Sequence, residues 1–394
     1  MIKREEGFTL IELIITMAIT ILVLAAASNV FIGLLTQFKQ QSKISETNIE
    51  GAVGLDILRR DIESAGYGLP WVIPAGVTYD EAVNDAATTH DDTAFNDSTT
   101  NPPRAIVSGN NVALNGSDAL IIKAVNVATS DASRKWTYLS KDNVVKEWTS
   151  TEERLVTSDR VIVLKLGTSD AERRTLVAVG GSFTTRYVAS TDPDSLFAAG
   201  FAPTDSSEKR IVYGITPLAN PVDTALRMPF NRTDYYVRKP ASNMPSKCAE
   251  NTGILYKATV NHNGGGLTEL PVLDCVADMQ VIFRTDTDSD GTLENRDASW
   301  TAGLTAQNIR DWLKEIRVYI LAHEGQRDTN FTFSNFIFMD AGSCPTVPAG
   351  QCITVGYHSG GTHYGRDFAL TTIADYQNYR WKVYSIVIKP NSMR

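Results

Sequence analysis

The longest predominantly apolar stretch of the chain lies near its N-terminus and runs from Phe8 to Leu35. A helix of about 20 apolar residues crosses the hydrocarbon layer of a bilayer, so this pattern predicts a membrane-spanning helix over 8–35. The stretch contains one acidic residue, Glu12. A carboxylate inside a membrane costs on the order of 2.5–3.5 kcal/mol at the helix centre, so we expect Glu12 to have a partner.

A polar segment follows the apolar stretch, and an amphipathic pattern then returns. Apolar residues recur at spacings of three and four, which marks one face of a helix. They are Leu55, Leu58, Ile62 and Ala65. The pattern predicts one long helix over 8–66 that ends at Gly66, a good stop signal. Gly33, Gly51 and Gly54 each weaken a helix by up to about 1 kcal/mol, so we expect local bending or melting there.

The chain beyond residue 66 has the pattern of a β-rich domain, 67–394. Six runs separated by turn residues are typical of strands: Ala119–Val125, Arg160–Leu166, Tyr235–Arg238, Ala277–Phe283, Glu315–Leu321 and Trp381–Ile388. In the fifth run apolar and polar residues alternate, which predicts a strand with one covered face. We expect an α+β fold, with a mainly antiparallel sheet packed on the long helix and large loop insertions. Residues 71–111 show little periodicity and are expected to form a surface insertion.

Composition and charge narrow the class of protein. The chain has 394 residues, 43% of them hydrophobic, which is ordinary for a globular protein and excludes a long disordered one. Its net charge is -8 and it has no basic cluster, which argues against a nucleic-acid partner. Lys3 and Arg4 precede the apolar stretch and place that end in the cytoplasm. The domain that follows would then be exported across the inner membrane by a single span.

The junction Gly7-Phe8-Thr9-Leu10-Ile11-Glu12, followed by the apolar stretch, resembles the prepilin signal of type IV pilins and of type II secretion pseudopilins. The resemblance implies that residues 1–7 are a leader, that a prepilin peptidase cuts after Gly7, and that the new terminal amine of Phe8 is methylated. It also implies that Glu12 pairs with the terminal amine of a neighbouring subunit. The implied partners are other major and minor pilins, contacted through the N-terminal helix, and the inner-membrane assembly platform.

Two other readings of the N-terminus stay open. Ala25-Ala26-Ala27 has the A-x-A pattern of an ordinary secretory signal, which would be cut before Ser28. Glu12 could also reach the membrane interface from a plain anchor helix. Ordinary signals, however, place a basic segment directly against an uninterrupted apolar core, whereas this one carries Glu5, Glu6 and Glu12.

Four further segments resemble the PilW-type minor pilins, a family of larger size than ordinary pilins. They are Leu58–Tyr67, Gly116–Leu120, Tyr235–Arg238 and Tyr379–Ser385. The resemblance implies a minor pilin that acts in the initiation or assembly of a type IV pilus, at its tip or base, and then leaves the membrane with the extracellular filament. The alternatives are a pilus-borne adhesin whose ligand contacts lie after Trp71, a type II secretion pseudopilin, and a surface hydrolase on a pilin stalk.

The four cysteines are Cys248, Cys275, Cys344 and Cys352. An even number in an exported domain suits two disulfides, and of the three connectivities we favour nearest neighbours, Cys248 with Cys275 and Cys344 with Cys352. The first pair flanks a predicted hairpin at 264–266. A zinc site is the alternative, but the chain has no Cys-x-x-Cys and its histidines are scattered.

The segment 286–297 follows the spacing of a calcium-binding loop. Calcium takes six to eight oxygens, which an EF-hand loop supplies from positions 1, 3, 5, 7, 9 and 12, with glycine at position 6. The corresponding residues are Asp286, Asp288, Asp290, Thr292, Glu294 and Asp297, with Gly291 at position 6. Asp297 is shorter than the usual closing glutamate, and the run before the loop predicts a strand rather than a helix. The alternative is a solvated acidic turn.

Catalytic motifs are missing from the sequence. The chain contains no nucleophile elbow, phosphate-binding loop, dinucleotide fingerprint or HExxH zinc motif. A paired-carboxylate hydrolase has no sequence signature and stays open. We therefore expect a protein that is not an enzyme.

Overall fold

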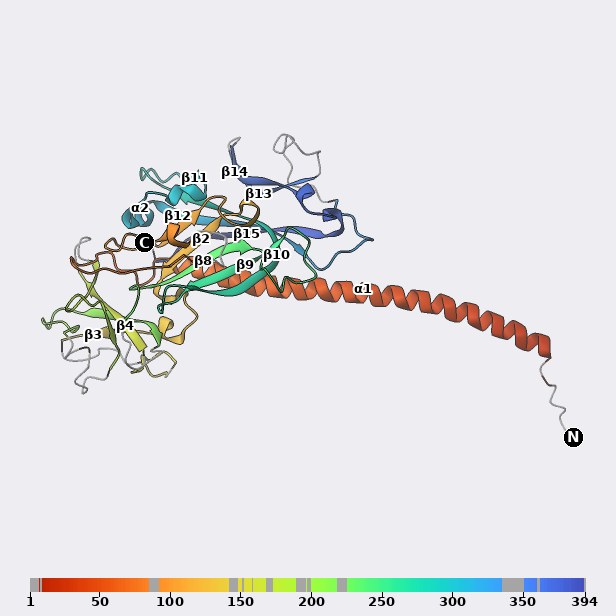
Figure 1. Cartoon of the computed structure of the whole chain (residues 1–394), viewed down its shortest axis with the longest axis horizontal. Helices are drawn as coiled ribbons and strands as arrows, with labels where there is room; N and C mark the ends of the chain where they lie inside the picture. Colours follow the sequence, from red (N-terminus) through yellow and green to blue (C-terminus); the bar gives the residue numbers. More distant parts are fainter. Residues whose placement is uncertain are drawn as a thin grey trace.

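One continuous helix, α1 (Leu10–Ser64), dominates the computed structural model of the chain (Figure 1). The structure describes residues 7, 9–84, 92–141, 148–150, 152–157, 159–167, 173–188, 196, 200–217, 225–334, 351–359 and 362–392. Thr9 caps the helix at its start, and Gly66 follows its end in the left-handed conformation, with a φ of 83°, that favours glycine. The predicted stop at Gly66 is confirmed.

The glycines of α1 do not melt it. The helix runs through Gly33, Gly51 and Gly54 without interruption, so of the expected bending or melting the melting is wrong, whereas α1 does curve along its length (Figure 1). Gly54 instead permits close packing, because a Cβ atom there would lie 1.9 Å from the carbonyl oxygen of Val272. A Cβ atom on Gly33 would meet nothing within 4 Å. The helix therefore needs glycine at position 54 because the backbone of a strand passes directly beside it.

In the described part of the chain, eight strands form the main sheet, in the order β1-β2-β8-β9-β10-β12-β15 with β11 beside β10. All the pairings in this sheet are antiparallel. The strands are β1 (Ile106–Gly109), β2 (Ala119–Ala124), β8 (Asn231–Arg238), β9 (Gly253–Val260), β10 (Leu267–Thr285), β11 (Glu294–Arg296), β12 (Leu313–Glu324) and β15 (Arg380–Ile388). The fold class is the predicted one: a long apolar N-terminal helix followed by a mainly antiparallel β-domain.

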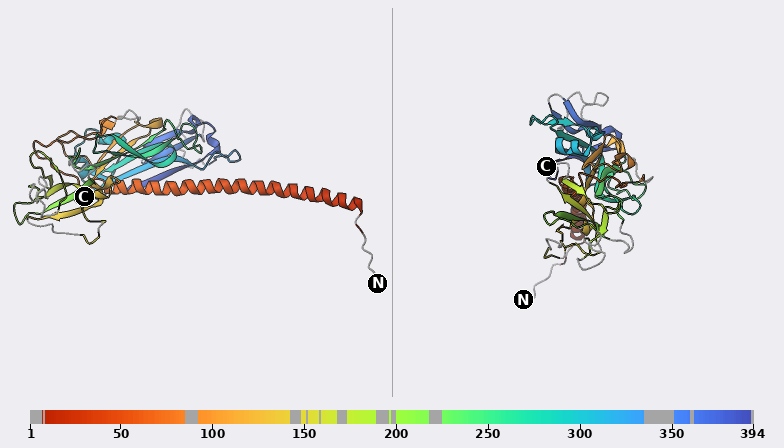
Figure 2. Two further views of the ribbon diagram at one scale, coloured as in Figure 1. Left: turned by 60° about the horizontal axis from the view of Figure 1, so that its bottom comes forward. Right: turned by 90° about the vertical axis from the view of Figure 1, so that its left-hand side faces the viewer.

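A smaller sheet lies at the end of the molecule farthest from the N-terminus, past the C-terminal end of α1 (Figures 1 and 2). Its described strands have the order β3-β7-β4-β5, with β6 beside β4. They are β3 (Trp136–Leu139), β4 (Asp159–Leu166), β5 (Arg173–Leu176), β6 (Thr184–Arg186) and β7 (Arg210–Pro217). A separate hairpin comprises β13 (Cys352–Ser359) and β14 (Thr362–Ala369), and a short helix, α2 (Ala306–Trp312), precedes β12.

The C-terminal half of α1 packs on the main sheet. Leu58, Ile62 and Ala65, predicted from their spacing to face the domain, are fully buried. The carboxylate of Asp61 accepts a hydrogen bond from the Tyr235 hydroxyl at 2.6 Å and pairs with Lys257 at 2.5 Å. The helix is thus held by apolar contacts and by the two buried polar contacts of Asp61, one of which joins segments 174 residues apart.

The opposite side of β12 is also covered. Ile316, Val318 and Ile320 lie in the core shared with α1, as their alternation predicts. Tyr319 and Leu321 point to the other face, where a second apolar cluster includes residues of β13 and β14. The prediction of one covered face is therefore incomplete, because a hairpin distant in sequence returns over the sheet.

The segment 71–111 is not a surface insertion in its described part. Val77, Tyr79, Glu81 and Phe95 are buried, and the segment ends in β1, which pairs with β2. Its Asp, Asn and Pro content suggested exposure. The prediction failed because composition does not show which distant residues form hydrogen bonds and ion pairs with the polar groups of the segment. The partners lie on β2 and β8, as described below.

Candidate functional site

The N-terminal half of α1 makes no packing contact with the described part of the domain. Its apolar side chains are exposed along Leu10–Phe38, and the stretch is long and apolar enough to cross a membrane. Figure 2 shows this half extending away from the β-domain. Soluble proteins rarely expose so long an apolar surface, so this half needs a bilayer or neighbouring apolar helices around it.

Glu12 lies in the first turn of α1 and forms a capping box with Thr9. Its carboxylate accepts hydrogen bonds from the Thr9 backbone N–H at 2.9 Å and from the Thr9 hydroxyl at 2.7 Å. The glutamate therefore helps to close the helix end within its own chain. Gly7 is exposed just before the helix, while Phe8, Lys3 and Arg4 lie outside the described residues.

Three members of the predicted calcium loop come together. Carboxylate oxygens of Asp286, Asp288 and Asp290 all lie within 4.8 Å of one another. Asp286 is half-buried, and its Oδ1 atom makes no hydrogen bond within the described part of the chain. Gly291 at position 6 has a φ of 82°, the left-handed turn that the loop pattern requires.

The last two predicted carboxylates of the loop have other contacts. Glu294 lies on β11, and its carboxylate accepts a hydrogen bond from the Thr285 hydroxyl at 3.3 Å. Asp297 caps a short 3₁₀ helix by accepting a hydrogen bond from the Ser299 N–H at 2.9 Å. Thr292 donates its N–H to Asp290 at 2.6 Å. The structure thus gathers the three aspartates but does not bring Glu294 and Asp297 to the same point.

Cys248 and Cys275 form the disulfide that the sequence favoured, with their Cα atoms 4.8 Å apart. The predicted hairpin between them is present, because β9 and β10 pair across a turn at 261–266. Cys352 lies at the start of β13, and its predicted partner Cys344 lies outside the described residues.

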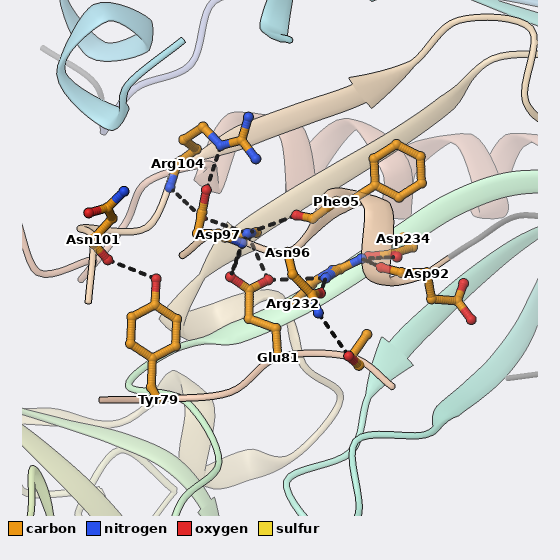
Figure 3. Close-up of polar contacts among 12 residues, drawn as sticks. Tyr79, Glu81, Asp92, Phe95, Asn96, Asp97, Asn101, Arg104, Arg232 and Asp234 are labelled. Atoms are coloured by element: carbon orange, nitrogen blue, oxygen red, sulfur yellow. Dashed lines mark hydrogen bonds and ion pairs between the residues drawn. The ribbon is translucent and has the colours of Figure 1, made fainter. Parts of the chain in front are cut away.

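A buried network of charged side chains, not predicted from the sequence, joins segment 79–104 to β2 and β8 (Figure 3). Lys123 of β2 donates to Glu81 at 2.8 Å, to Asp97 at 2.7 Å and to the carbonyl oxygen of Phe95 at 3.3 Å. All three of its N–H donors therefore have acceptors. The Lys123 and Glu81 side chains are fully buried.

Arg232 of β8 is the second buried cation of this network. Its guanidinium bonds to both carboxylate oxygens of Asp234, at 2.8 and 2.7 Å, and to Glu81 at 3.0 Å. It also donates to Asn96 at 2.6 Å and to the carbonyl oxygen of Asp92 at 2.9 Å. Burial lowers the pKa of Arg232, but Asp234 and Glu81 outweigh burial and hold that pKa above its ordinary value.

Asp97 connects the interior of the network to its outer edge. It pairs with Lys123 inside and with Arg104, at 2.5 Å, toward the surface, as Figure 3 shows for Arg104. Burial raises the pKa of Asp97, but Lys123 and Arg104 outweigh it, so the pKa lies below its ordinary value. The ion pairs of the network join three cations, Lys123, Arg104 and Arg232, to three anions, Glu81, Asp97 and Asp234.

One sequence signal could have revealed this network. Lys123 interrupts the apolar run Ala119–Val125, and a lysine inside a buried strand requires buried carboxylates nearby. The sequence does not say which carboxylates, because Glu81 and Asp97 lie in a segment without helical or strand periodicity.

Comparison with known proteins identifies the N-terminal motif. Residues 2–28 match the family model described as the prokaryotic N-terminal methylation motif. No curated protein and no solved structure matches the chain. The motif supports a type IV pilin-like or pseudopilin protein, and it implies association with other pilins and with a prepilin peptidase in general. Together with the exposed apolar half of α1, it is consistent with a membrane anchor.

Proposed function

We propose that the protein is a minor pilin of the PilW type, cut after Gly7, held in the inner membrane by one span and then assembled into a type IV pilus. The observation that carries the proposal is the methylation motif over 2–28, continued by an apolar helix half that the domain leaves uncovered. Its role is structural rather than catalytic. An adhesin and a type II secretion pseudopilin are the other candidates.

The shape of the molecule supports a place at the tip of the filament. The small sheet lies past the C-terminal end of α1, at the end of the molecule opposite the N-terminus (Figure 1). If the helices of a filament lie side by side and point the same way, this sheet occupies the space that the next subunit along the filament would need. A tip position avoids that overlap, and a subunit placed first can act in initiation.

Glu12 provides the test of the assembly role. Gln at this position can still accept the hydrogen bonds from Thr9 but carries no charge, so E12Q separates helix capping from charge pairing. We expect E12Q and E12A to reach the membrane and to be recovered with sheared filaments several-fold less than the parent. The matched control is E46A, since Glu46 is an exposed glutamate farther along α1.

Two results would contradict this assignment. Normal recovery of E12Q with sheared filaments would show that the charge of Glu12 has no part in assembly. Peptide mass spectrometry that finds a mature start at Ser28, or an uncut Met1 form in piliated cells, would contradict processing after Gly7.

We also propose that the Asp286–Asp288–Asp290 cluster binds calcium. Three carboxylates within 4.8 Å of one another repel unless a cation lies between them, and the buried Oδ1 of Asp286 has no other described partner. Because Glu294 and Asp297 contact other groups, the remaining ligands would be backbone carbonyls and water, and binding would be weaker than in an EF-hand.

Isothermal titration of the full-length protein in detergent tests the calcium site. We expect heat of binding in the millimolar range that D288A abolishes. D205A is the matched control, because Asp205 makes the same kind of turn contact, with Ser207 at 2.8 Å, outside any described acidic cluster. No heat in the parent, or unchanged binding in D288A, would leave only an acidic turn.

A further inference from the structure

A cavity of about 500 Å³ opens at the outer edge of the buried network. One wall is the loop 96–104, which carries Asp97 and Arg104, and the facing wall is 303–310, including Arg310 of α2. Trp71 closes one side. This volume lies within the range of about 300–1,000 Å³ typical of small-molecule sites.

Two arginines stack on the Trp71 ring. The guanidinium carbon of Arg310 lies 4.3 Å from the ring centroid and that of Arg174 lies 5.0 Å from it. The backbone fixes this arrangement, because the Trp71 N–H donates to the Arg174 carbonyl oxygen at 3.0 Å. Among the described residues, Arg174 itself donates a long hydrogen bond, 3.4 Å, to the Gly66 carbonyl oxygen.

Arg310 is a half-buried cation that has the charge of Asp311 nearby but no ion-pair partner among the described residues. Within the described part of the chain no carboxylate forms an ion pair with it, and no hydrogen bond to its guanidinium is present. Burial lowers the pKa of Arg310 and the nearby Arg174 lowers it further, while Asp311 opposes both. The π face of Trp71 offsets only part of the cost of an unpaired charge.

The neighbouring arginines show what Arg310 is missing. Arg104, on the facing wall of the cavity, pairs with Asp97, and the fully buried Arg232 pairs with Asp234 and Glu81. The fold therefore supplies a carboxylate to each of these two arginines. An arginine that is left unpaired at the wall of a cavity is available to bind an anion from outside the chain.

The other groups of the cavity favour a ligand rich in hydroxyls. The side chains of Ser98, Asn101 and Gln307 line it and make no hydrogen bond within the described residues. Asp97 adds a carboxylate oxygen that can accept a hydrogen bond from a hydroxyl. An acidic peptide side chain would use Arg310 and leave most of the cavity volume empty.

We propose that this cavity binds a carboxylated sugar, with the carboxylate on Arg310 and the hydroxyls on Asp97, Ser98, Asn101 and Gln307. The proposal does not depend on the filament assignment. It places a specific binding site in the part of the chain, after Trp71, to which the adhesin alternative assigned the ligand contacts.

The test uses the full-length protein in detergent and two ligands that differ mainly in the carboxylate, glucuronate and glucose. A charge-assisted hydrogen bond contributes enough to separate the two by about tenfold or more in affinity. We expect glucuronate to bind in the millimolar range or tighter, glucose to bind at least about tenfold more weakly, and R310Q to lose the difference.

R317Q is the matched control variant. Arg317 also stacks on an aromatic ring, that of Tyr357 at 4.6 Å, but it pairs with Glu315 at 2.6 Å. R317Q should bind glucuronate as the parent does and melt at a lower temperature. R310Q should melt at or above the temperature of the unliganded parent, because it removes an unpaired, half-buried charge.

Four results would overturn the proposal. Absence of glucuronate binding at millimolar concentration, or equal binding of glucose, would show that no anion site exists. A fall in melting temperature for R310Q as large as that for R317Q would show that Arg310 only stabilises the fold. Tighter binding of triglutamate than of glucuronate would assign the cavity to an acidic peptide instead.

Discussion

Removal of Lys123 tests whether the charged network stabilises the domain. K123M keeps a side chain of similar length but removes the ammonium that three acceptors share: Glu81, Asp97 and the carbonyl oxygen of Phe95. All of these groups lie in segment 79–104, whereas Lys123 lies on β2. The substitution therefore breaks the link between that segment and the sheet.

The magnitude follows from the burial of the partners. Loss of one member of a buried ion pair costs about 3–5 kcal/mol, because the remaining charge stays away from water. Glu81 keeps Arg232 and Asp97 keeps Arg104, so we expect a value near the lower end, about 3 kcal/mol. At about 2 °C per kcal/mol for a domain of this size, the melting temperature should fall by about 6 °C.

The assay compares K123M with K382M by thermal and urea unfolding of the full-length protein in detergent. Lys382 also pairs with a glutamate, Glu324 at 2.9 Å, but its side chain is 49% exposed, and exposed pairs contribute only about 0–1 kcal/mol. K382M should change the melting temperature by no more than about 2 °C.

A double variant separates loss of charge balance from loss of packing. E81Q in the K123M background removes one anion, so that Arg104–Asp97 and Arg232–Asp234 remain as balanced pairs. The double variant should recover part of the stability lost in K123M. The reasoning fails if K123M is as stable as K382M, or if the double variant loses as much as the two single variants together.

Two further predictions concern the packing of α1 and one buried acid. G54A should destabilise the domain by about 1–3 kcal/mol in thermal unfolding, because its Cβ would overlap the Val272 carbonyl oxygen. The control G33A should be neutral or slightly stabilising. Equal effects of the two substitutions would contradict close packing at Gly54. Burial raises the pKa of Asp118 to about 7, above its unfolded value of about 3.9, so the folded state binds a proton that the unfolded chain has lost. The stability of the parent relative to D118N should therefore rise by about 2–3 kcal/mol as the pH falls from 8 to 5, and urea midpoints that differ by the same amount at both pH values would refute this.

Periodic patterns were sufficient to predict the long helix and six of the strands, but not the remaining described strands or α2. All six runs read as strands from the sequence fall within or overlap strands of the structure, and the stripe Leu58, Ile62 and Ala65 is buried against the main sheet. These predictions succeed because a strand or helix face is specified by neighbours two to four residues apart. The exposed half of α1 was predicted in the same way, because its length and apolarity are properties of that segment alone.

Contacts between distant segments could not be predicted in the same way. The three clustered aspartates were predicted from the spacing of the loop. Glu294, however, is part of the paired strand β11, and Asp297 caps a 3₁₀ helix. The positions of both residues depend on how β10 and β11 pair, and this pairing cannot be predicted from the sequence of the loop. Cys248 and Cys275 were easier, because one hairpin brings them together.

The large sequence separation between contacting residues also explains why the segment 71–111 was misjudged and why it needs a charged network. Its described part has little regular structure, a 3₁₀ helix at Asp92–Phe95, so backbone hydrogen bonds alone do not fix its path. Buried ion pairs add little net stability over apolar packing. A buried charge that loses its partner is costly, however, so such pairs favour the one conformation in which every charge is paired. Here Lys123 and Arg232 select the conformation in which Asp97 and Arg104 lie on the cavity wall, opposite Arg310. We infer that the network fixes a loop whose outer side forms the binding cavity, so K123M should weaken glucuronate binding even though Lys123 does not line that cavity.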